Sequence, residues 1–303
     1  MVSSALSAFA VDSAAPSYVV DKELGKGTLN SAISYIALDA SGRLLVPQGS
    51  KVLVVDPDSG ATVLSFDSGL ANITSIASDK SGIYVLSTKT QQETREFQGQ
   101  KRTFSMPAGV ACKRFDMQGK NGQDVSLPGA KAALSARVFK GKLYVADSQA
   151  KKVVVFDLAT GRKTAQIGDN LRLCCGIFDF CVDPANGDVL IANLGAFQLQ
   201  RYDSEGKLKS AFGKRGSSEA DFGGCCNPVS AEVLTDGNVV LVEKSPSKVK
   251  LYRADGSFLA SLPQVTELVE GCSRVPVIRD AKGNIYVASN RKGNIAVIKC
   301  TPK

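Results

Sequence analysis

The segment Ala136-Arg-Val-Phe-Lys-Gly141-Lys-Leu-Tyr-Val-Ala-Asp147, followed by Lys152-Val-Val-Val-Phe-Asp157, contains the pattern that decides the fold. Apolar and polar residues alternate on both sides of Gly141, which is typical of half-buried strands. Glycine accepts the positive φ of a tight hairpin turn, so the pattern predicts two antiparallel strands joined at Gly141. The apolar run over residues 152–157 predicts a third strand beside them.

This pattern occurs six times along the 303 residues. Its marker glycines lie at positions 42, 82, 141, 187, 237 and 283, so successive spacings are 40, 59, 46, 50 and 46 residues. In several copies a turn such as Asp203-Ser-Glu-Gly206 leads to a fourth strand, in that copy Ser210-Ala-Phe212. Four short antiparallel strands at this period are typical of β-propeller blades. The sequence therefore predicts an all-β, six-bladed propeller.

The chain ends of the propeller carry a further prediction. The sixth copy stops at Lys303 after three strands, whereas a spare strand, residues 18–24, precedes the first copy. We expect this N-terminal strand to complete the last blade and close the ring, giving one propeller domain over residues 17–303. Residues 90–107 of the second copy are polar and lack the alternation, which predicts a surface loop or a hairpin extension.

Composition excludes several classes of function. The chain contains no His, so no Ser-His-Asp triad, Cys-His dyad or His-ligated zinc site can be built. The formal charge is 37 − 29 = +8, but Lys and Arg are spread along the whole chain, which makes a nucleic-acid partner an unfavoured interpretation. No window reaches the roughly 18 uncharged apolar residues of a transmembrane helix.

Residues 1–16 are small and mostly apolar, and Ala8-Phe9-Ala10 resembles a signal-peptide cleavage site. The basic start of a secretory signal is missing. We expect this segment to be a disordered lead-in or the remnant of an export signal, and the second alternative predicts a periplasmic or secreted protein.

All six copies resemble NHL repeats, whose consensus joins an Asp–Gly turn to Ile-Tyr-Val-Ala-Asp and a strand ending in Phe-Asp, although the first two copies are degenerate. The matching segments are Gly283-Asn-Ile-Tyr-Val-Ala-Ser289 and Lys142–Asp147 with its continuation to Asp157. Phe222-Gly-Gly-Cys-Cys-Asn-Pro228 is similar to the Gly-Cys-Cys-Asn-Pro element of a bacterial NHL-like subgroup. In that subgroup a His often follows Asn-Pro, but Val229 occupies this position, so no role of that His is transferred. The resemblance implies a six-bladed propeller and no settled activity.

Five of the eight cysteines share one position in the repeat. Each lies 11 to 13 residues before the marker glycine of its own copy, directly ahead of the innermost strand of a blade. Because the innermost strands line the channel of a propeller, we expect these sulfurs at one channel mouth. The five are Cys174, Cys175, Cys225, Cys226 and Cys272.

Three interpretations of the cysteines stay open. Disulfides, including bonds within the vicinal pairs, would suit an exported protein. A thiolate site could hold a soft metal ion or an iron–sulfur cluster, although the spacing matches no ferredoxin or zinc-ribbon pattern. A redox-active dithiol would need a lowered thiol pKa. The other cysteines, Cys112, Cys181 and Cys300, lie in expected strands and are interpreted as core thiols.

Polar residues give weaker signals. Asp147, Asn193 and Glu243 follow the second strand of their blades, where lactonase-like propellers hold a divalent cation, and Asp179 is expected near the channel. The alternative for these positions is support of a turn or loop. Lys214 and Arg215, in a Gly-rich loop, form the best candidate contact for an anion.

These observations favour a non-enzymatic binding or scaffolding propeller of the cell envelope, with a protein or small-molecule ligand at one face and no expected cofactor. The first alternative is a redox, soft-metal or iron–sulfur propeller that uses the five cysteines. The second is a lactonase-like, metal-dependent hydrolase.

Overall fold

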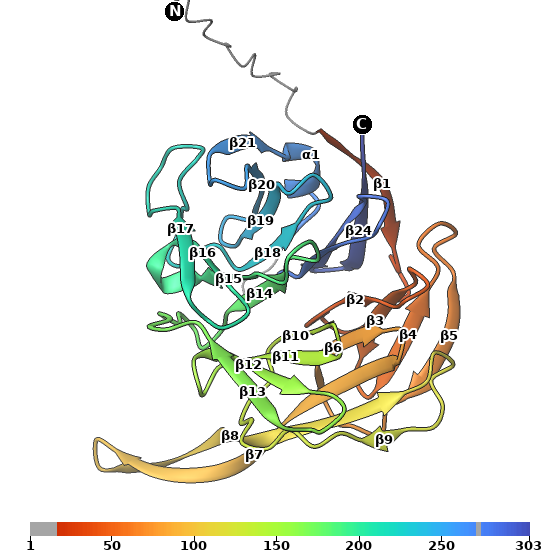
Figure 1. The fold of residues 1–303 in the computed structure, drawn as a ribbon, viewed down its shortest axis with the longest axis vertical. Coiled ribbons are helices and arrows are strands. Elements are labelled where there is room, and N and C mark those ends of the chain that lie inside the picture. The colour runs from red at the N-terminus through yellow and green to blue at the C-terminus, as the bar shows by residue number, and fades with distance from the viewer. Residues whose placement is uncertain (1–16, 271–273) are drawn as a thin grey trace, which may run out of the picture.

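The computed structural model describes residues 17–270 and 274–303, which form a six-bladed β-propeller of six four-stranded antiparallel sheets (Figure 1). The strands of every sheet are named from the innermost to the outermost. The first sheet contains β2 (Ala37–Leu38), β3 (Leu44–Gln48), β4 (Lys51–Val55) and β5 (Thr62–Asp67). The second contains β6 (Ile73–Asp79), β7 (Gly82–Phe97), β8 (Gln100–Phe115) and β9 (Gln123–Asp124). The third contains β10 (Ala136–Phe139), β11 (Lys142–Asp147), β12 (Lys152–Asp157) and β13 (Lys163–Ile167).

The remaining sheets follow the same plan. The fourth contains β14 (Asp179–Val182), β15 (Val189–Asn193), β16 (Gln198–Tyr202) and β17 (Leu208–Phe212). The fifth contains β18 (Ser230–Val233), β19 (Val239–Glu243), β20 (Lys248–Tyr252) and β21 (Phe258–Ser261). The sixth contains β22 (Val277–Arg279), β23 (Ile285–Arg291), β24 (Asn294–Pro302) and β1 (Tyr18–Leu24). A 3-10 turn (Leu194–Ala196) and a short helix, α1 (Pro263–Thr266), complete the described elements.

The marker glycines act as expected. Gly141 has a φ of 73° and joins β10 to β11, with Phe139 opposite Lys142. Only a residue without a Cβ adopts this backbone at low cost. Apolar residues of neighbouring sheets fill the space between blades, as where Phe156 of β12 and Tyr84 of β7 share one buried cluster. The core is therefore a series of layers between adjacent sheets.

The sixth sheet contains strands from both ends of the described chain. β1 pairs antiparallel with β24, from Tyr18 opposite Pro302 to Leu24 opposite Val297. Leu24 also lies in a buried cluster with Ile36, which directly precedes β2 of the first sheet, and with Tyr286 of the sixth sheet. Residues 18–24 thus lie beside the last strand, and the contribution of this pairing to closing the ring in solution stays a prediction.

The insertion in the second blade is a hairpin extension, one of the two expected forms. β7 and β8 pair along their whole length, from Ile83 opposite Phe115 to Phe97 opposite Gln100, and their far ends project from the ring (Figure 1). Most side chains of this arm are exposed, including Phe104 at 42%.

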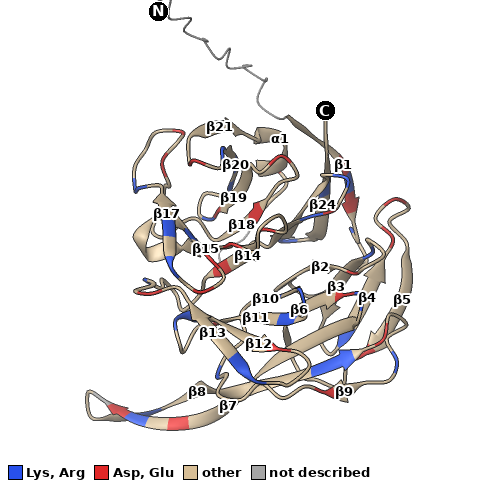
Figure 2. Cartoon of the chain, viewed as in Figure 1, with Lys and Arg blue, Asp and Glu red and all other residues tan. Residues whose placement is uncertain are grey.

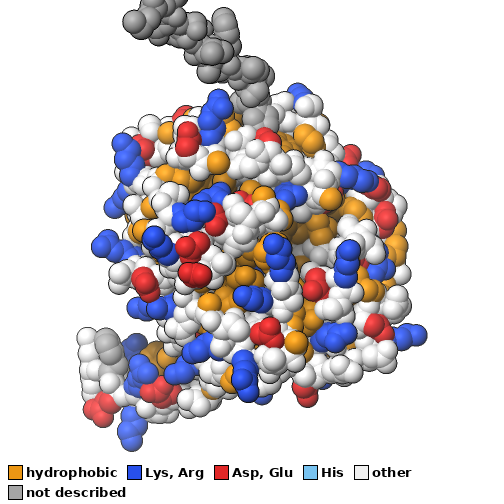
Figure 3. Space-filling view, in the orientation of Figure 1, with side chains coloured by type: hydrophobic (Ala, Val, Ile, Leu, Met, Phe, Trp, Pro, Cys, Tyr) orange, Lys and Arg blue, Asp and Glu red, His pale blue; other side chains and the backbone are white. Residues whose placement is uncertain are grey.

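Some expectations concern residues outside the described part of the chain: the lead-in or export-signal remnant at residues 1–16, and Cys272. Among the described residues, no helix has the length and apolar character needed to cross a bilayer. Lys and Arg are scattered singly over the visible face, with Asp and Glu between them (Figure 3).

Candidate functional site: a cysteine cluster of two blades

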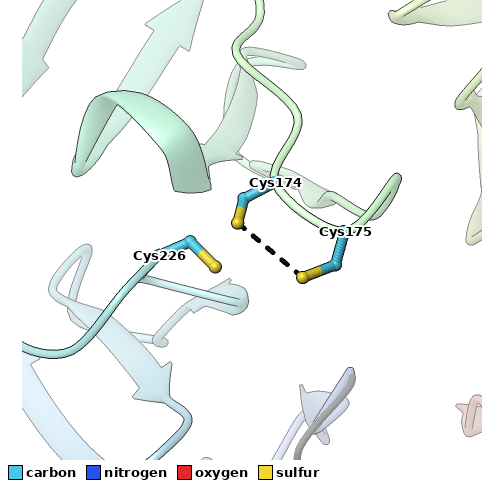
Figure 4. A group of neighbouring side chains, drawn as sticks. All are labelled: Cys174, Cys175 and Cys226. Carbon is cyan, nitrogen blue, oxygen red and sulfur yellow. Dashed lines mark hydrogen bonds between the residues drawn. The ribbon is translucent and has the colours of Figure 1, made fainter.

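Four cysteines from two adjacent blades come together ahead of the innermost strands of these blades. Cys174 and Cys175 lie in the segment that enters β14, and Cys225 and Cys226 lie in the segment that enters β18. The Sγ atoms are 3.7 Å apart in the first pair and 3.2 Å apart in the second. The sulfurs of Cys174, Cys175 and Cys226 all lie within 4.8 Å of one another and point toward a common centre (Figure 4).

The backbone of the first pair is a tight turn. Cys175 has a φ of 57° and Gly176 a φ of 69°, both in the left-handed region, and Cys174 forms an isolated bridge with Ile177. Left-handed backbone at two successive residues reverses the chain within a few positions. This turn brings both sulfurs to the same side of the loop (Figure 4).

The second pair is held by the Asn227 side chain. Its amide nitrogen donates hydrogen bonds to the Gly223 and Lys244 carbonyls, at 2.7 and 3.0 Å, and its oxygen accepts one from the Lys244 backbone N–H at 2.8 Å. Asn227 is 1% exposed, so these bonds are shielded from water. The loop that carries Cys225 and Cys226 is therefore tied to the residue that follows β19.

The four thiols differ in their surroundings. Cys226 is buried, and burial together with hydrogen bonding to Cys174 and Cys225 raises its pKa. Cys225 is exposed, and the hydrogen bond from Cys226, with the nearby charge of Lys244, lowers its pKa. The Lys244 ammonium also lies 3.9 Å from the Cys175 sulfur. The cluster thus combines one thiol with a lowered pKa, one thiol with a raised pKa and a neighbouring cation.

The three other described cysteines are separate from this cluster and buried in strands β8, β14 and β24, as interpreted from sequence. Burial raises the pKa of Cys112 and of Cys300 to about 12, so both stay protonated thiols at neutral pH.

The polar residues that follow each second strand hold loops. Asp147 accepts the Lys131 N–H at 2.8 Å, Asn193 accepts the Arg172 N–H at 2.9 Å, and Glu243 accepts the Gly223 N–H at 2.8 Å. In every case the donor belongs to the segment entering the innermost strand of the same blade. Each of these side chains thus has a local backbone partner. Among the described residues, three or more possible metal ligands of Cys, Asp or Glu lie within 4.8 Å of one another only in the group Cys174, Cys175 and Cys226. Asp147, Asn193 and Glu243 are not part of that group.

The remaining sequence candidates lie elsewhere. Asp179 is the first residue of β14 and is 1% exposed, and burial raises its pKa. Lys214 is exposed and lies 3.9 Å from Asp221, whereas the Arg215 guanidinium lies over the Phe197 ring at 5.5 Å. The structure therefore pairs Lys214 with a carboxylate of its own loop.

Sequence reasoning missed Lys244 and a set of channel arginines. Lys244 directly follows the loop-holding Glu243, a position that gave no separate signal. Arg137 is the second residue of β10, Arg274 lies in the segment that enters β22, and Arg279 is the last residue of β22. The repeat usually has small or apolar residues at these positions, and this departure from the pattern was the available signal.

No family model matches this chain, and no curated protein matches its sequence. Solved structures share its fold. A protein of unknown function from Bacteroides thetaiotaomicron VPI-5482 has a TM-score of 0.63 at 15% identity, covering 95% of this chain and 76% of that chain. A protein of unknown function from Bacteroides caccae has a TM-score of 0.53 at 12% identity, covering 85% and 89%. A streptogramin B lyase structure has a TM-score of 0.55 at 10% identity, covering 94% and 98%.

At these identities the likeness concerns the fold alone. The chain is a six-bladed β-propeller with propeller-like structural neighbours, one of which is an enzyme. The resemblance to NHL repeats and to the Gly-Cys-Cys-Asn-Pro subgroup stays a prediction.

Proposed function

We propose that this protein is a non-enzymatic binding propeller whose ligand is a soft metal ion held by the thiolates of Cys174, Cys175 and Cys226. The observation that supports it is the convergence of three sulfurs within 4.8 Å from two separate blades. Thiolates select soft ions such as Cu⁺ and Zn²⁺ over hard, oxygen-seeking ions.

The sulfur separations suit one central ion better than a disulfide. A Zn–S distance of about 2.3 Å places tetrahedral thiolates about 3.8 Å apart. The Cys174–Cys175 separation of 3.7 Å is already close to this value. The three sulfurs lie at most 4.8 Å apart, which is about 1.0 Å more than the tetrahedral sulfur–sulfur distance. Rotation of the cysteine side chains can close this difference. A disulfide would require contraction of the same pair to about 2.05 Å.

Charge also favours an ion at this position. Three thiolates around one Cu⁺ or Zn²⁺ leave a net negative complex, and the nearby Lys244 ammonium compensates part of it. Cys225 supplies an exposed sulfur next to the site, where an incoming ion meets it first. We place the protein in the periplasm or outside the cell, where a bound ion would protect these thiols from oxidation.

Metal titration tests the proposal. Reduced protein is titrated anaerobically with Zn²⁺ and, separately, with Cu⁺ in competition with a chromogenic chelator. We expect one equivalent to bind, and Cys226→Ser to weaken binding by about 100-fold or more. Cys112→Ala removes a remote buried thiol and is the matched control, with affinity unchanged. Wild-type affinity in both Cys226→Ser and Cys174→Ser would overturn the proposal.

A redox dithiol is the second candidate, and a specific observation favours it. Cys225 and Cys226 are neighbours with sulfurs 3.2 Å apart and pKa values shifted in opposite directions, as in a pair with one attacking and one resolving thiol. Reversible loss of two titratable thiols, abolished by Cys225→Ser and accompanied by no metal binding, would replace the metal proposal with this one.

A further inference from the structure

The centre of the ring contains a buried polar cluster to which every blade contributes. Figure 2 shows acidic positions of β14 and β18 near the centre of the ring. The contributions, in order of the sheets, are the Tyr35 side chain, the Thr74 carbonyl, Arg137, Asp179, Glu232 and Arg274. Both Arg137 and Arg274 lie over the Tyr35 ring, at 5.0 and 5.8 Å from its centroid, so the cluster reaches across the channel.

The charges of this cluster balance when all of its groups are ionised. Arg137 and Arg274 face two carboxyl groups, Asp179 and Glu232, so the sum is 2 − 2 = 0, and Arg279 and Asp280 of the adjoining cavity add one charge of each sign. Burial raises the pKa of Glu232 to about 7 and raises that of Asp179, so proton uptake by either carboxyl group leaves a surplus positive charge. Isolated positive charge is costly in a buried site, which makes the channel a favourable place for an anion.

Two buried polar atoms of the cluster have no hydrogen-bond partner among residues 17–270 and 274–303. They are Nη1 of Arg274, a residue 9% exposed, and the hydroxyl of Tyr35, which is fully buried. The other terminal nitrogen of Arg274 donates to the Thr74 carbonyl at 3.2 Å. A fully formed polar core satisfies such groups, so these unpaired N–H and O–H groups indicate that an acceptor is missing.

A cavity adjoins the cluster. Its volume is about 290 Å³, and most of its wall is apolar, including Ile36, Val138 and Ile278. Arg137, Glu232 and Arg279 also line it, so Arg137 connects the cavity with the buried cluster. The Arg137–Glu232 contact is long, 3.5 Å, so the guanidinium can donate a shorter hydrogen bond to another acceptor.

We infer that the channel binds a small organic carboxylate, with its carboxylate on Arg137 and its apolar part in the cavity. The guanidinium fork matches carboxylate geometry. The apolar wall favours an organic anion over an inorganic one. The volume corresponds to about ten water molecules at about 30 Å³ each, which limits the ligand to a molecule of roughly that many heavy atoms. In this arrangement Glu232 competes with the ligand for Arg137.

Calorimetric titration of metal-free protein with hexanoate tests the inference independently of the cysteine site. Acetate, chloride and hexylammonium are the comparison ligands, since they lack the apolar part or the negative charge. We expect saturable binding of hexanoate alone. Arg137→Gln should weaken it about tenfold or more, and Glu232→Gln should strengthen it because the competing carboxylate is gone. Arg95→Gln, on the exposed β7–β8 arm, is the control and should change nothing.

Several results would overturn this inference. Absence of saturable hexanoate binding contradicts it, as does equal binding of chloride or hexylammonium. Wild-type affinity in Arg137→Gln also contradicts it. If Arg137→Gln does not fold, the inference is tested by the ligand series on wild-type protein and by the hexanoate affinity of Glu232→Gln. Weaker hexanoate binding by Glu232→Gln than by wild type contradicts the inference. Loss of metal binding with intact hexanoate binding would affect the proposed function alone.

Discussion

Substituting Lys250 with Met should destabilise the fold strongly. Its side chain is 0% exposed and its ammonium forms an ion pair with Glu243, which is 2% exposed. The ammonium also donates a hydrogen bond to the Asp221 carbonyl at 2.7 Å, while Glu243 accepts the Gly223 N–H. The pair therefore fixes both sides of Phe222 in the segment leading to the cysteines.

The magnitude follows from burial. Met is an unbranched apolar replacement, so the main loss is electrostatic. Removing one partner of a buried ion pair costs about 3–5 kcal/mol, because the other charge stays buried and uncompensated. The double variant Lys250→Met/Glu243→Gln removes that stranded charge and keeps an oxygen for the Gly223 N–H. We expect the double variant to recover about 2 kcal/mol relative to Lys250→Met.

Urea unfolding of wild type, both single variants and the double variant measures this coupling. Lys209→Met is the matched control, since its ammonium pairs with Asp188 at 2.7 Å but its side chain is 47% exposed. Such a surface pair is worth at most about 1 kcal/mol. A Lys250→Met protein within about 1 kcal/mol of wild type, at an unchanged dependence on urea, would refute the reasoning, as would strictly additive single-variant effects.

Three further predictions concern stability. Leu24→Ala, in the strand that pairs with β24, should lower the free energy of unfolding in urea by about 2–4 kcal/mol, whereas the exposed control Val63→Ala should lower it by less than about 0.5 kcal/mol. Equally small effects of the two substitutions would contradict a role of β1 in closing the ring. The folded-state pKa of Glu232, about 7, lies above its ordinary value of 4.5, so the folded protein binds a proton more tightly than the unfolded chain. The stability of the wild type should therefore fall by up to about 3 kcal/mol, relative to Glu232→Gln, as the pH rises from 4.5 to 7. Parallel pH profiles of stability for the two proteins would contradict this. Asp147→Ala should lower the free energy of unfolding by about 1–3 kcal/mol, because it leaves the Lys131 N–H without its acceptor. Hydrogen exchange at the Lys131 amide should then become faster, and an unchanged exchange rate would contradict this explanation.

Repetition made the architecture predictable. Gly141 and its equivalents recur because each blade needs the same positive-φ turn, so a local rule applied six times indicates the whole fold. The shared position of the cysteines ahead of the innermost strands predicted a common location, and the structure brings Cys174, Cys175, Cys225 and Cys226 together there, with Cys272 outside the described residues.

The rest of the site depends on contacts between repeats that no single repeat encodes. Lys244 reaches the Cys175 sulfur only because the fourth and fifth blades are adjacent. Arg274 and Tyr35 meet because the sixth and first blades are neighbours in the ring, although 239 residues separate them in sequence (274 − 35). The role of Asp147 in holding its loop likewise requires the position of the Lys131 backbone, which lies in an irregular segment.

X-ray absorption at the zinc edge of the Zn²⁺-loaded protein tests the metal site most directly. Coordination by Cys174, Cys175 and Cys226 predicts a shell dominated by three or four sulfur atoms at about 2.3 Å, and Cys226→Ser should contain one sulfur fewer. A shell dominated by nitrogen or oxygen at about 2.0–2.1 Å, or a sulfur shell unchanged by Cys226→Ser, would contradict it.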